Sequence, residues 1–152
     1  MPAQAGFTLI ELLIVIGLIA VVGSAVLFID LNSYRGDAFR TERSTLVNLL
    51  GQARIDSLNN VDQKPHGLAL FPADAPDSYV LFEGTSYAAS DPATRVAYKA
   101  NYAFALSPAS PHEVVFEQLN GNASVSGTIT MQDTNRNFSY DISINSEGGL
   151  NW

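Results

Sequence analysis

The chain opens with a long apolar segment whose pattern differs from everything that follows. Within residues 7–29 the only side chains with polar groups are Thr8, Glu11 and Ser24. As one helix this segment spans roughly 35 Å, which is enough to cross a bilayer. A core helix of a soluble protein would show a polar face at a 3.6-residue period, and none appears before Asp30. The pattern predicts a transmembrane helix over residues 7–29.

Residues 30–60 mix apolar and charged positions at helical spacing and predict an amphipathic continuation of the same helix. Gly36 lowers helix propensity and permits a bend. Asn59, Asn60 and Pro65 mark the end of this helix. Its apolar face comprises Leu46, Leu49, Leu50, Ala53, Ser57 and Leu58.

Residues 67–152 change to a period of two, which predicts antiparallel strands. Clusters of Pro, Gly, Asn and Asp between the apolar runs supply the turns. The predicted strands are 67–71, 78–82, 95–106, 113–119, 126–132 and 138–144. A sheet with one apolar face needs a cover, and the amphipathic helix is the available element. We therefore expect an α+β fold with one globular domain over residues 30–152.

Two common kinds of segment could also account for the apolar run: a cleaved secretory signal and a plain membrane anchor. A cleaved secretory signal is one, because Gly23, Ser24 and Ala25 form a small-residue cluster of the kind that signal peptidase accepts. It fits poorly, because the first six residues carry no positive charge and the apolar run is longer than a signal requires. A plain membrane anchor is the other explanation, with Glu11 reaching the interface from the helix end.

The residues from Gly6 to Leu13 read Gly-Phe-Thr-Leu-Ile-Glu-Leu-Leu. This run resembles, position for position, the signal of type IV prepilins and type II secretion pseudopilins. A small residue before a Phe that opens an apolar helix, with an acid four residues later, is a specific pattern.

The resemblance implies that residues 1–6 are a leader peptide, which a prepilin peptidase removes by cutting after Gly6. The same enzyme would methylate the new amine of Phe7. Glu11 would act in assembly, because a carboxylate in lipid is costly unless it pairs, here with the first amine of a neighbouring subunit. The implied fold is pilin-like, with a long helix half in the membrane and half packed on an antiparallel β-sheet.

A second resemblance, to the H-type minor pseudopilins and their pilus relatives, covers the rest of the chain as a pattern of elements. It rests on the segment 53–58, on a following strand that begins at Gly67, and on a late strand pair that ends at residues 146–149.

Composition and charge narrow the function. The chain has no cysteine, so neither disulfides nor cysteine metal sites are available. Its net charge is -7, and from Val61 onward ten acids face four bases. Such a surface repels phosphates, so we expect no nucleic-acid partner.

No catalytic or cofactor-binding constellation appears, and we expect neither a cofactor nor a metal. His66 and His112 each stand beside a proline, which predicts solvated loop histidines. Residues 133–137 resemble a calcium loop but lack the Gly and the Glu that such a loop needs, so a polar turn is expected. The aromatic residues should lie mostly in the core, while Trp152 can be either buried or a contact for a neighbour.

The predicted function is structural: a minor subunit of a type IV filament, acting as a pseudopilin in type II protein secretion. The alternative is a minor type IV pilus subunit for adhesion, motility or DNA uptake. A membrane-anchored enzyme has no supporting residues. Expected partners are other pilin or pseudopilin subunits, the prepilin peptidase, the inner-membrane assembly platform and membrane lipid. The chain should be a single-pass protein of the cytoplasmic membrane, with its soluble domain outside the cytoplasm.

Overall fold

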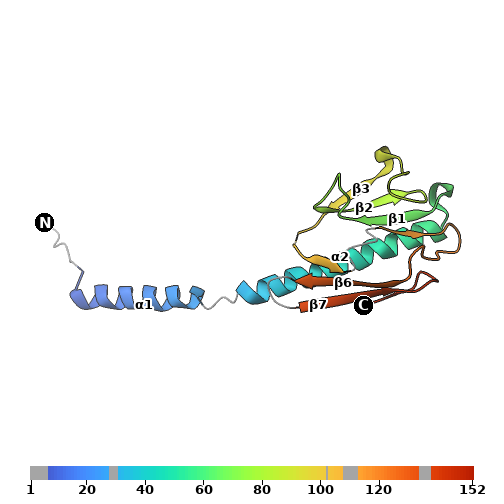
Figure 1. Cartoon of the computed structure of the whole chain (residues 1–152). Coiled ribbons are helices and arrows are strands. Elements are labelled where there is room, and N and C mark those ends of the chain that lie inside the picture. The colour runs from blue at the N-terminus through green and yellow to red at the C-terminus, as the bar shows by residue number, and fades with distance from the viewer. Residues whose placement is uncertain (1–6, 28–30, 102, 108–112, 134–137) are drawn as a thin grey trace. The chain divides into compact units, whose positions relative to one another are not determined.

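The structure of the chain is a computed structural model that describes residues 7–27, 31–101, 103–107, 113–133 and 138–152. The leader peptide predicted over residues 1–6 lies outside this part. The chain divides into two compact units, residues 1–36 and residues 37–152. Figure 1 shows the helices and strands of both units, which are described separately below.

Two helices fall where the apolar and amphipathic patterns predicted helix. Helix α1 is Leu9–Leu27 and helix α2 is Leu31–Leu58. The predicted continuity of these helices falls on residues 28–30, which lie outside the described part. A short 3-10 helix, η1 (Val61–Gln63), follows α2, and Asn60 before it has a left-handed backbone. This backbone reversal ends α2 close to the predicted position.

The strands of the second unit form two antiparallel sheets rather than the single sheet that we predicted. The first sheet has the order β3-β2-β1-β5 and the second has the order β4-β6-β7-β8. The first sheet comprises β1 (His66–Leu70), β2 (Ser78–Glu83), β3 (Val96–Lys99) and β5 (Glu113–Phe116). The second comprises β4 (Ala105–Ser107), β6 (Gly127–Asp133), β7 (Phe138–Ile144) and β8 (Leu150–Asn151).

The prediction of one strand over residues 95–106 is wrong, because this stretch supplies a strand to each sheet. β3 pairs with β2, with Val96 opposite Leu81, whereas β4 pairs with β6, with Leu106 opposite Met131. An alternating pattern reports that a segment is extended, but it does not report which strand lies beside it. The short strand β8 was not predicted.

One core joins α2 to both sheets. Leu46, Leu50 and Ala53 of α2 are completely buried, and side chains from the inner faces of both sheets pack against them. The sheet side chains in this core include Leu68, Leu70, Tyr79, Val114, Phe116, Met131, Ile142 and Ile144. The second unit therefore buries its own apolar surface, as the predicted cover of the sheet by the helix requires.

The outer face of the first sheet carries a smaller apolar cluster: Ala69, Val80, Phe82 and Val115. Tyr87, from the loop between β2 and β3, packs on it with its ring 5.6 Å from the ring of Phe82. This loop also contains the 3-10 helix η2 (Pro92–Thr94). The loop gives the outer face a cover of its own.

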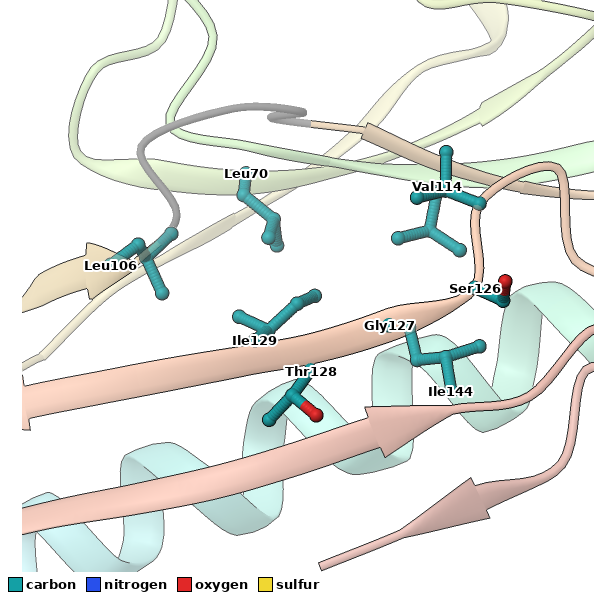
Figure 2. Close-up of a pocket in the computed structure, with 9 residues that line it drawn as sticks. Leu70, Leu106, Val114, Ser126, Gly127, Thr128, Ile129 and Ile144 are labelled. Atoms are coloured by element: carbon teal, nitrogen blue, oxygen red, sulfur yellow. The ribbon is translucent and has the colours of Figure 1, made fainter.

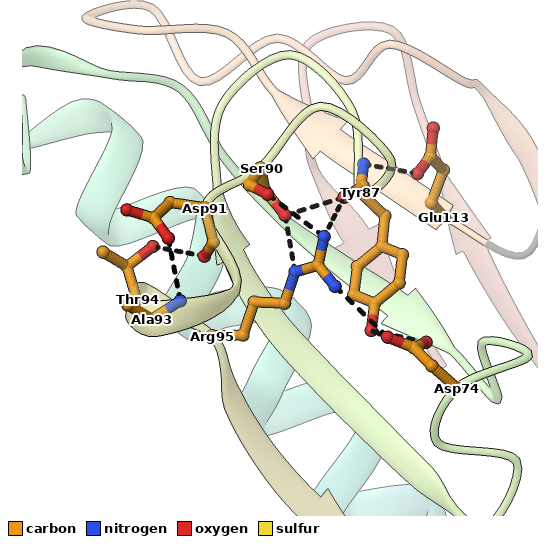
Figure 3. A network of polar contacts seen from close by, with 8 residues as sticks. All are labelled: Asp74, Tyr87, Ser90, Asp91, Ala93, Thr94, Arg95 and Glu113. Carbon is orange, nitrogen blue, oxygen red and sulfur yellow. Dashed lines mark hydrogen bonds and ion pairs between the residues drawn. The ribbon is translucent and has the colours of Figure 1, made fainter.

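Figure 3 shows the polar network that holds this loop in place. The guanidinium of Arg95 lies 4.0 Å from the centre of the Tyr87 ring and donates to the Tyr87 carbonyl at 2.7 Å. It also donates to the Ser90 hydroxyl at 2.8 Å and pairs with Asp74 at 3.2 Å. The Tyr87 amide donates to Glu113 of β5 at 2.8 Å. A planar guanidinium suits this combination of stacking and several hydrogen bonds.

The expectation that the aromatic residues are core is only partly right. Tyr79, Phe82 and Phe116 are buried, but Tyr98 and Phe138 are exposed. Phe104 and Tyr140 are half-buried, and Tyr102 lies outside the described residues. Tyr98 lies on β3, whose four residues are all exposed, and Phe138 is the first residue of β7, whose buried residues come later in the strand. Alternation alone does not show which part of a strand is covered.

Candidate assembly site

The start of α1 is built by a local cap. Thr8 precedes the helix, and its hydroxyl accepts from the Glu11 amide at 3.3 Å, while its carbonyl accepts from the same amide at 3.1 Å. Thr followed three residues later by Glu is the sequence of a capping box. The run that carries the motif therefore also explains why the helix begins at Leu9.

The described surface of α1 is apolar on every side. Phe7 is 82% exposed, and the large apolar side chains that follow it along the helix are exposed as well. These include Leu9, Ile10, Leu12, Leu13, Ile14, Ile16, Leu18, Ile19, Val21 and Val22. Over residues 9–24, whose exposure the structure describes, the helix has no face that its own unit covers. Within the described residues, no helix reaches the combined length and hydropathy that a membrane span requires.

The two described members of the predicted site, Phe7 and Glu11, lie at one end of this helix. Glu11 is in the first turn of α1 and is exposed. A carboxylate there interacts favourably with the positive end of the helix dipole and remains available to a cationic partner. Gly6 lies outside the described residues, so the cleavage position remains a prediction.

Comparison with known protein families finds a match at the N-terminal end of the chain. Residues 1–27 match the prokaryotic N-terminal methylation motif. The motif contains Gly6, Phe7 and Glu11 and supports a type IV pilin-like filament subunit. No curated protein and no solved structure gives a significant match to the chain. The methylation motif thus covers α1, and the unit from residue 37 onward must be understood from its own geometry.

That second unit contains an apolar cavity of about 140 Å³ between its two sheets (Figure 2). Leu70 and Val114 line it from the first sheet, and Leu106, Ile129 and Ile144 line it from the second. Polar groups come only from Ser126 and Thr128 and from the local backbone among the lining residues. Among the described residues, this lining is mostly apolar and includes no acidic, basic or histidine side chain.

A buried carboxylate, which the sequence reasoning missed, lies between α2 and the first sheet. Glu42 is 2% exposed, and its Oε2 accepts from the Asn101 amide at 3.2 Å. Its Oε1 makes no hydrogen bond among the described residues. Burial, and then the charge of Glu42, raise the pKa of the Tyr79 phenol above its ordinary value. The apolar spacing of α2 could have indicated Glu42, because residue 42 falls on the same face as Leu46 and Leu49.

The prediction for His66 is wrong. This residue is buried at the start of β1, its amide donates to the Ser57 hydroxyl at 2.8 Å, and its Nε2 lies 3.0 Å from the Val61 carbonyl. Pro65 is the last residue before β1, so His66 belongs to the strand and not to the loop. His112 and residues 134–137 of the calcium-like run lie outside the described residues. Trp152 is 60% exposed, so the alternative in which it is buried is wrong, and its contact with a neighbouring subunit stays a prediction.

Proposed function

We propose that this chain is a minor structural subunit of a type IV filament, and that the filament is the pseudopilus of a type II secretion system. One observation carries the proposal: the methylation motif coincides with an apolar helix that its own unit leaves exposed. A helix with no covered face is suited to burial by lipid or by other helices.

Processing comes first in the proposed function. A prepilin peptidase cuts after Gly6, the leader over residues 1–6 is lost, and the new amine of Phe7 is methylated. Cutting at this position leaves the Phe7 amine one helical turn from Glu11 in the sequence. The processed end then carries a positive amine and a negative carboxylate within the same short segment.

Assembly then depends on Glu11. A carboxylate in an apolar environment costs a few kcal/mol unless a cation neutralises it. The Phe7 amine of an adjacent subunit supplies that cation when the two subunits have the correct axial offset. The pair therefore acts as a register signal, because any other offset leaves both charges unpaired.

Before assembly, the segment over residues 7–29 anchors the subunit in the cytoplasmic membrane, with the unit from residue 37 outside the cytoplasm. The inner-membrane assembly platform and other pilin or pseudopilin subunits are its partners. In this proposal the chain performs no catalysis and needs no cofactor or metal. Its acidic surface, with net charge -7, disfavours nucleic acid.

The assignment to secretion rests on the resemblance of the element order to H-type minor pseudopilins. A helix, an early hairpin and a late strand pair follow one another as that resemblance expects. The same order fits a minor subunit of a type IV pilus for adhesion, motility or DNA uptake. Deleting the gene distinguishes the two, because the proposal expects loss of protein export with pili unchanged.

Mass spectrometry of the native protein tests the core of the proposal. We expect an N-terminus at Phe7 carrying a methyl group, and recovery of the protein in sheared filament fractions. A bulky residue in place of Gly6 should accumulate the precursor. An intact Met1 in assembled filaments would refute processing at this site.

A further inference from the structure

A pocket of about 340 Å³ lies where the chain passes from the first sheet to the second. Three segments line it: the end of β1, the loop before β2, and the stretch that joins β3 to β4. Its apolar lining is Phe71, Pro76, Ala100, Ala103 and Phe104. We name it the β3–β4 pocket. It belongs entirely to the unit from residue 37 onward.

Aromatic contacts fix one wall of this pocket. The ring of Phe71 lies 5.4 Å from the ring of Phe104, edge to face, and 5.2 Å from the ring of the buried Tyr79. The backbone of Phe71 is left-handed, with a φ of +52°, which is unfavourable for a residue with a Cβ. Its side chain is nevertheless only partly buried. A strained residue that leaves an aromatic ring partly in solvent indicates a contact outside the chain.

Backbone hydrogen bonds fix the opposite wall. The Ala100 amide donates to the Asp77 carbonyl at 2.8 Å, which ties the stretch after β3 to the loop before β2. The Asn101 amide donates to the carboxylate of Glu42 at 3.2 Å. Glu42 is buried on α2, so this bond attaches the wall to the core. The pocket is therefore formed before anything enters it, and an entering side chain meets little cost of ordering the walls.

Lys99 supplies a positive charge beside the apolar lining. Its side chain is exposed and lines the pocket. Within the described part of the chain, its ammonium has no ion pair or hydrogen bond. The other lysines and arginines whose side chains the structure describes all have partners within the chain: Arg40, Arg43, Arg54, Lys64 and Arg95. Lys99 is thus available to a molecule that enters the pocket.

Trp152 has the complementary chemistry. It is the chain's single tryptophan, is 60% exposed, and does not line the pocket of its own chain. An indole fills an aromatic-lined pocket well, and its face attracts an ammonium more strongly than a phenyl ring does. Phe138, at 58% exposure, is therefore a weaker candidate. Residues 150–152 carry no charged side chain, so the net charge of -7 creates no direct repulsion at this segment.

We propose that the β3–β4 pocket of one copy of this chain receives the Trp152 indole of a second copy, with the Lys99 ammonium against the indole face. A pocket of about 340 Å³ is at the small end of ligand sites, which suits a single side chain. One side chain buries less surface than a stable interface needs, so association should be weak and concentration-dependent. This contact goes beyond the proposed function, because it requires neither cleavage after Gly6 nor a filament.

Crosslinking of the full-length chain in detergent tests the proposal. The chain has no cysteine, so introduced cysteines report only on their own positions. Ala103→Cys lies in the pocket lining, and Asn151→Cys lies beside Trp152 on an isotope-labelled chain. With a short bis-maleimide, the mixture should give roughly tenfold more heterodimer than Ala103→Cys mixed with the exposed control Asn59→Cys. Equal yields, or a predominance of dimers joined through two copies of position 103, would overturn the proposal.

Trp152→Ala tests the indole itself. Added to the Asn151→Cys chain, it should lower the heterodimer yield by about tenfold, because it removes the side chain that fills the pocket. An unchanged yield would overturn the proposal.

Lys99→Glu, added to the Ala103→Cys chain, should lower the heterodimer yield by about fivefold, whereas Lys99→Arg should retain it. Lys64→Glu makes the same charge change at the other end of β2, since Lys64 pairs with Glu83 whereas Lys99 lies opposite Ser78. This control should keep the yield. An equal fall in both Glu variants, or a drop of several degrees in the melting temperature of Lys99→Glu, would overturn the role of Lys99.

Trp152 fluorescence gives a measurement without cysteines. As the full-length chain is concentrated in detergent, the emission should shift to shorter wavelength and acrylamide quenching should weaken, because the indole leaves water. The Lys99→Glu variant should lose this dependence. Emission that does not change with protein concentration would overturn the proposal. Chains with and without residues 1–6 should behave alike, so this result is independent of whether Gly6 is the cleavage position.

Discussion

Helix α1 and the unit from residue 37 onward differ in whether their apolar side chains are buried. Along α1 the large apolar side chains are exposed all round, from Leu9 to Val22. In the second unit, Leu46 and Leu50 of α2 are completely buried against two sheets. The first region presents apolar surface for other molecules, and the second uses it to fold.

The two regions differ in whether they contain other elements that can bury their apolar side chains. Burying one large aliphatic side chain stabilises a fold by about 1.5–3 kcal/mol, and a single helix cannot bury its own side chains. α1 can gain this stabilisation only from other molecules, which in our proposal are lipid and other subunits. The second unit gains it from its own strands, so its stability should be independent of assembly.

The largest expected effect comes from the core of the second unit. In the full-length protein in detergent, Leu50→Ala should lower the free energy of unfolding of this unit by about 2–5 kcal/mol, because it leaves a cavity at a fully buried position. Leu13→Ala, at an exposed position of α1, is the matched control and should leave the unfolding of this unit unchanged. Chemical denaturation followed by circular dichroism measures both. Equal losses would show that the two regions are not distinct in this way.

Glu11 tests the assembly role of α1. Glu11→Leu should leave the amount of protein in the membrane fraction unchanged but reduce its recovery in sheared filaments. The loss corresponds to a charge pair worth up to about 3 kcal/mol, or about a hundredfold. Ser24→Leu is the control, because it makes α1 more apolar without removing a charge. Equal recovery of both variants would reject the pairing of Glu11 with the Phe7 amine.

Two glycines in the second unit should respond in opposite directions. A Cβ on Gly67 would lie 2.5 Å from the Phe82 ring and 2.8 Å from the Val114 carbonyl, so Gly67→Ala should destabilise by about 1–3 kcal/mol. A Cβ on Gly51 meets nothing within 4 Å, and Gly51→Ala should stabilise α2 by about 0.5–1 kcal/mol. Thermal melting compares them. A neutral Gly67→Ala would mean that Phe82 moves aside easily.

The smallest effect concerns Tyr79 at alkaline pH. The unfolded phenol loses its proton near pH 10, whereas burial raises the pKa of Tyr79 in the folded protein. Above about pH 10 the unfolded state therefore binds fewer protons, so stability falls as pH rises, by up to about 1.4 kcal/mol per pH unit. Below that pH both states hold the proton and this group contributes no pH dependence. Tyr79→Phe should remove this part of the alkaline loss, while Tyr98→Phe, at an exposed position, should retain it.

The sequence alone determined the features that depend on local pattern. The apolar run, the motif from Gly6 to Leu13 and the end of α2 near Asn59 all follow from neighbouring residues, and the order of a helix followed by antiparallel strands is confirmed. Strands β1, β2, β6 and β7 lie close to their predicted ranges because alternation and turn residues are local signals. The roles of Gly6, Phe7 and Glu11 remain predictions that the motif supports.

Only the tertiary structure decided which segments meet. The residues over 95–106 alternate throughout, yet they divide between two sheets, because strand pairing is a long-range choice that period does not encode. His66 was expected in solvent, but it is buried, and its polar atoms contact Ser57 and Val61 from earlier in the chain. Leu119 is an ordinary apolar residue in sequence. Its exposure, left-handed backbone and contact with the end of α2 exist only because β5 brings its loop to Ser57, and burial and strain depend on such distant neighbours.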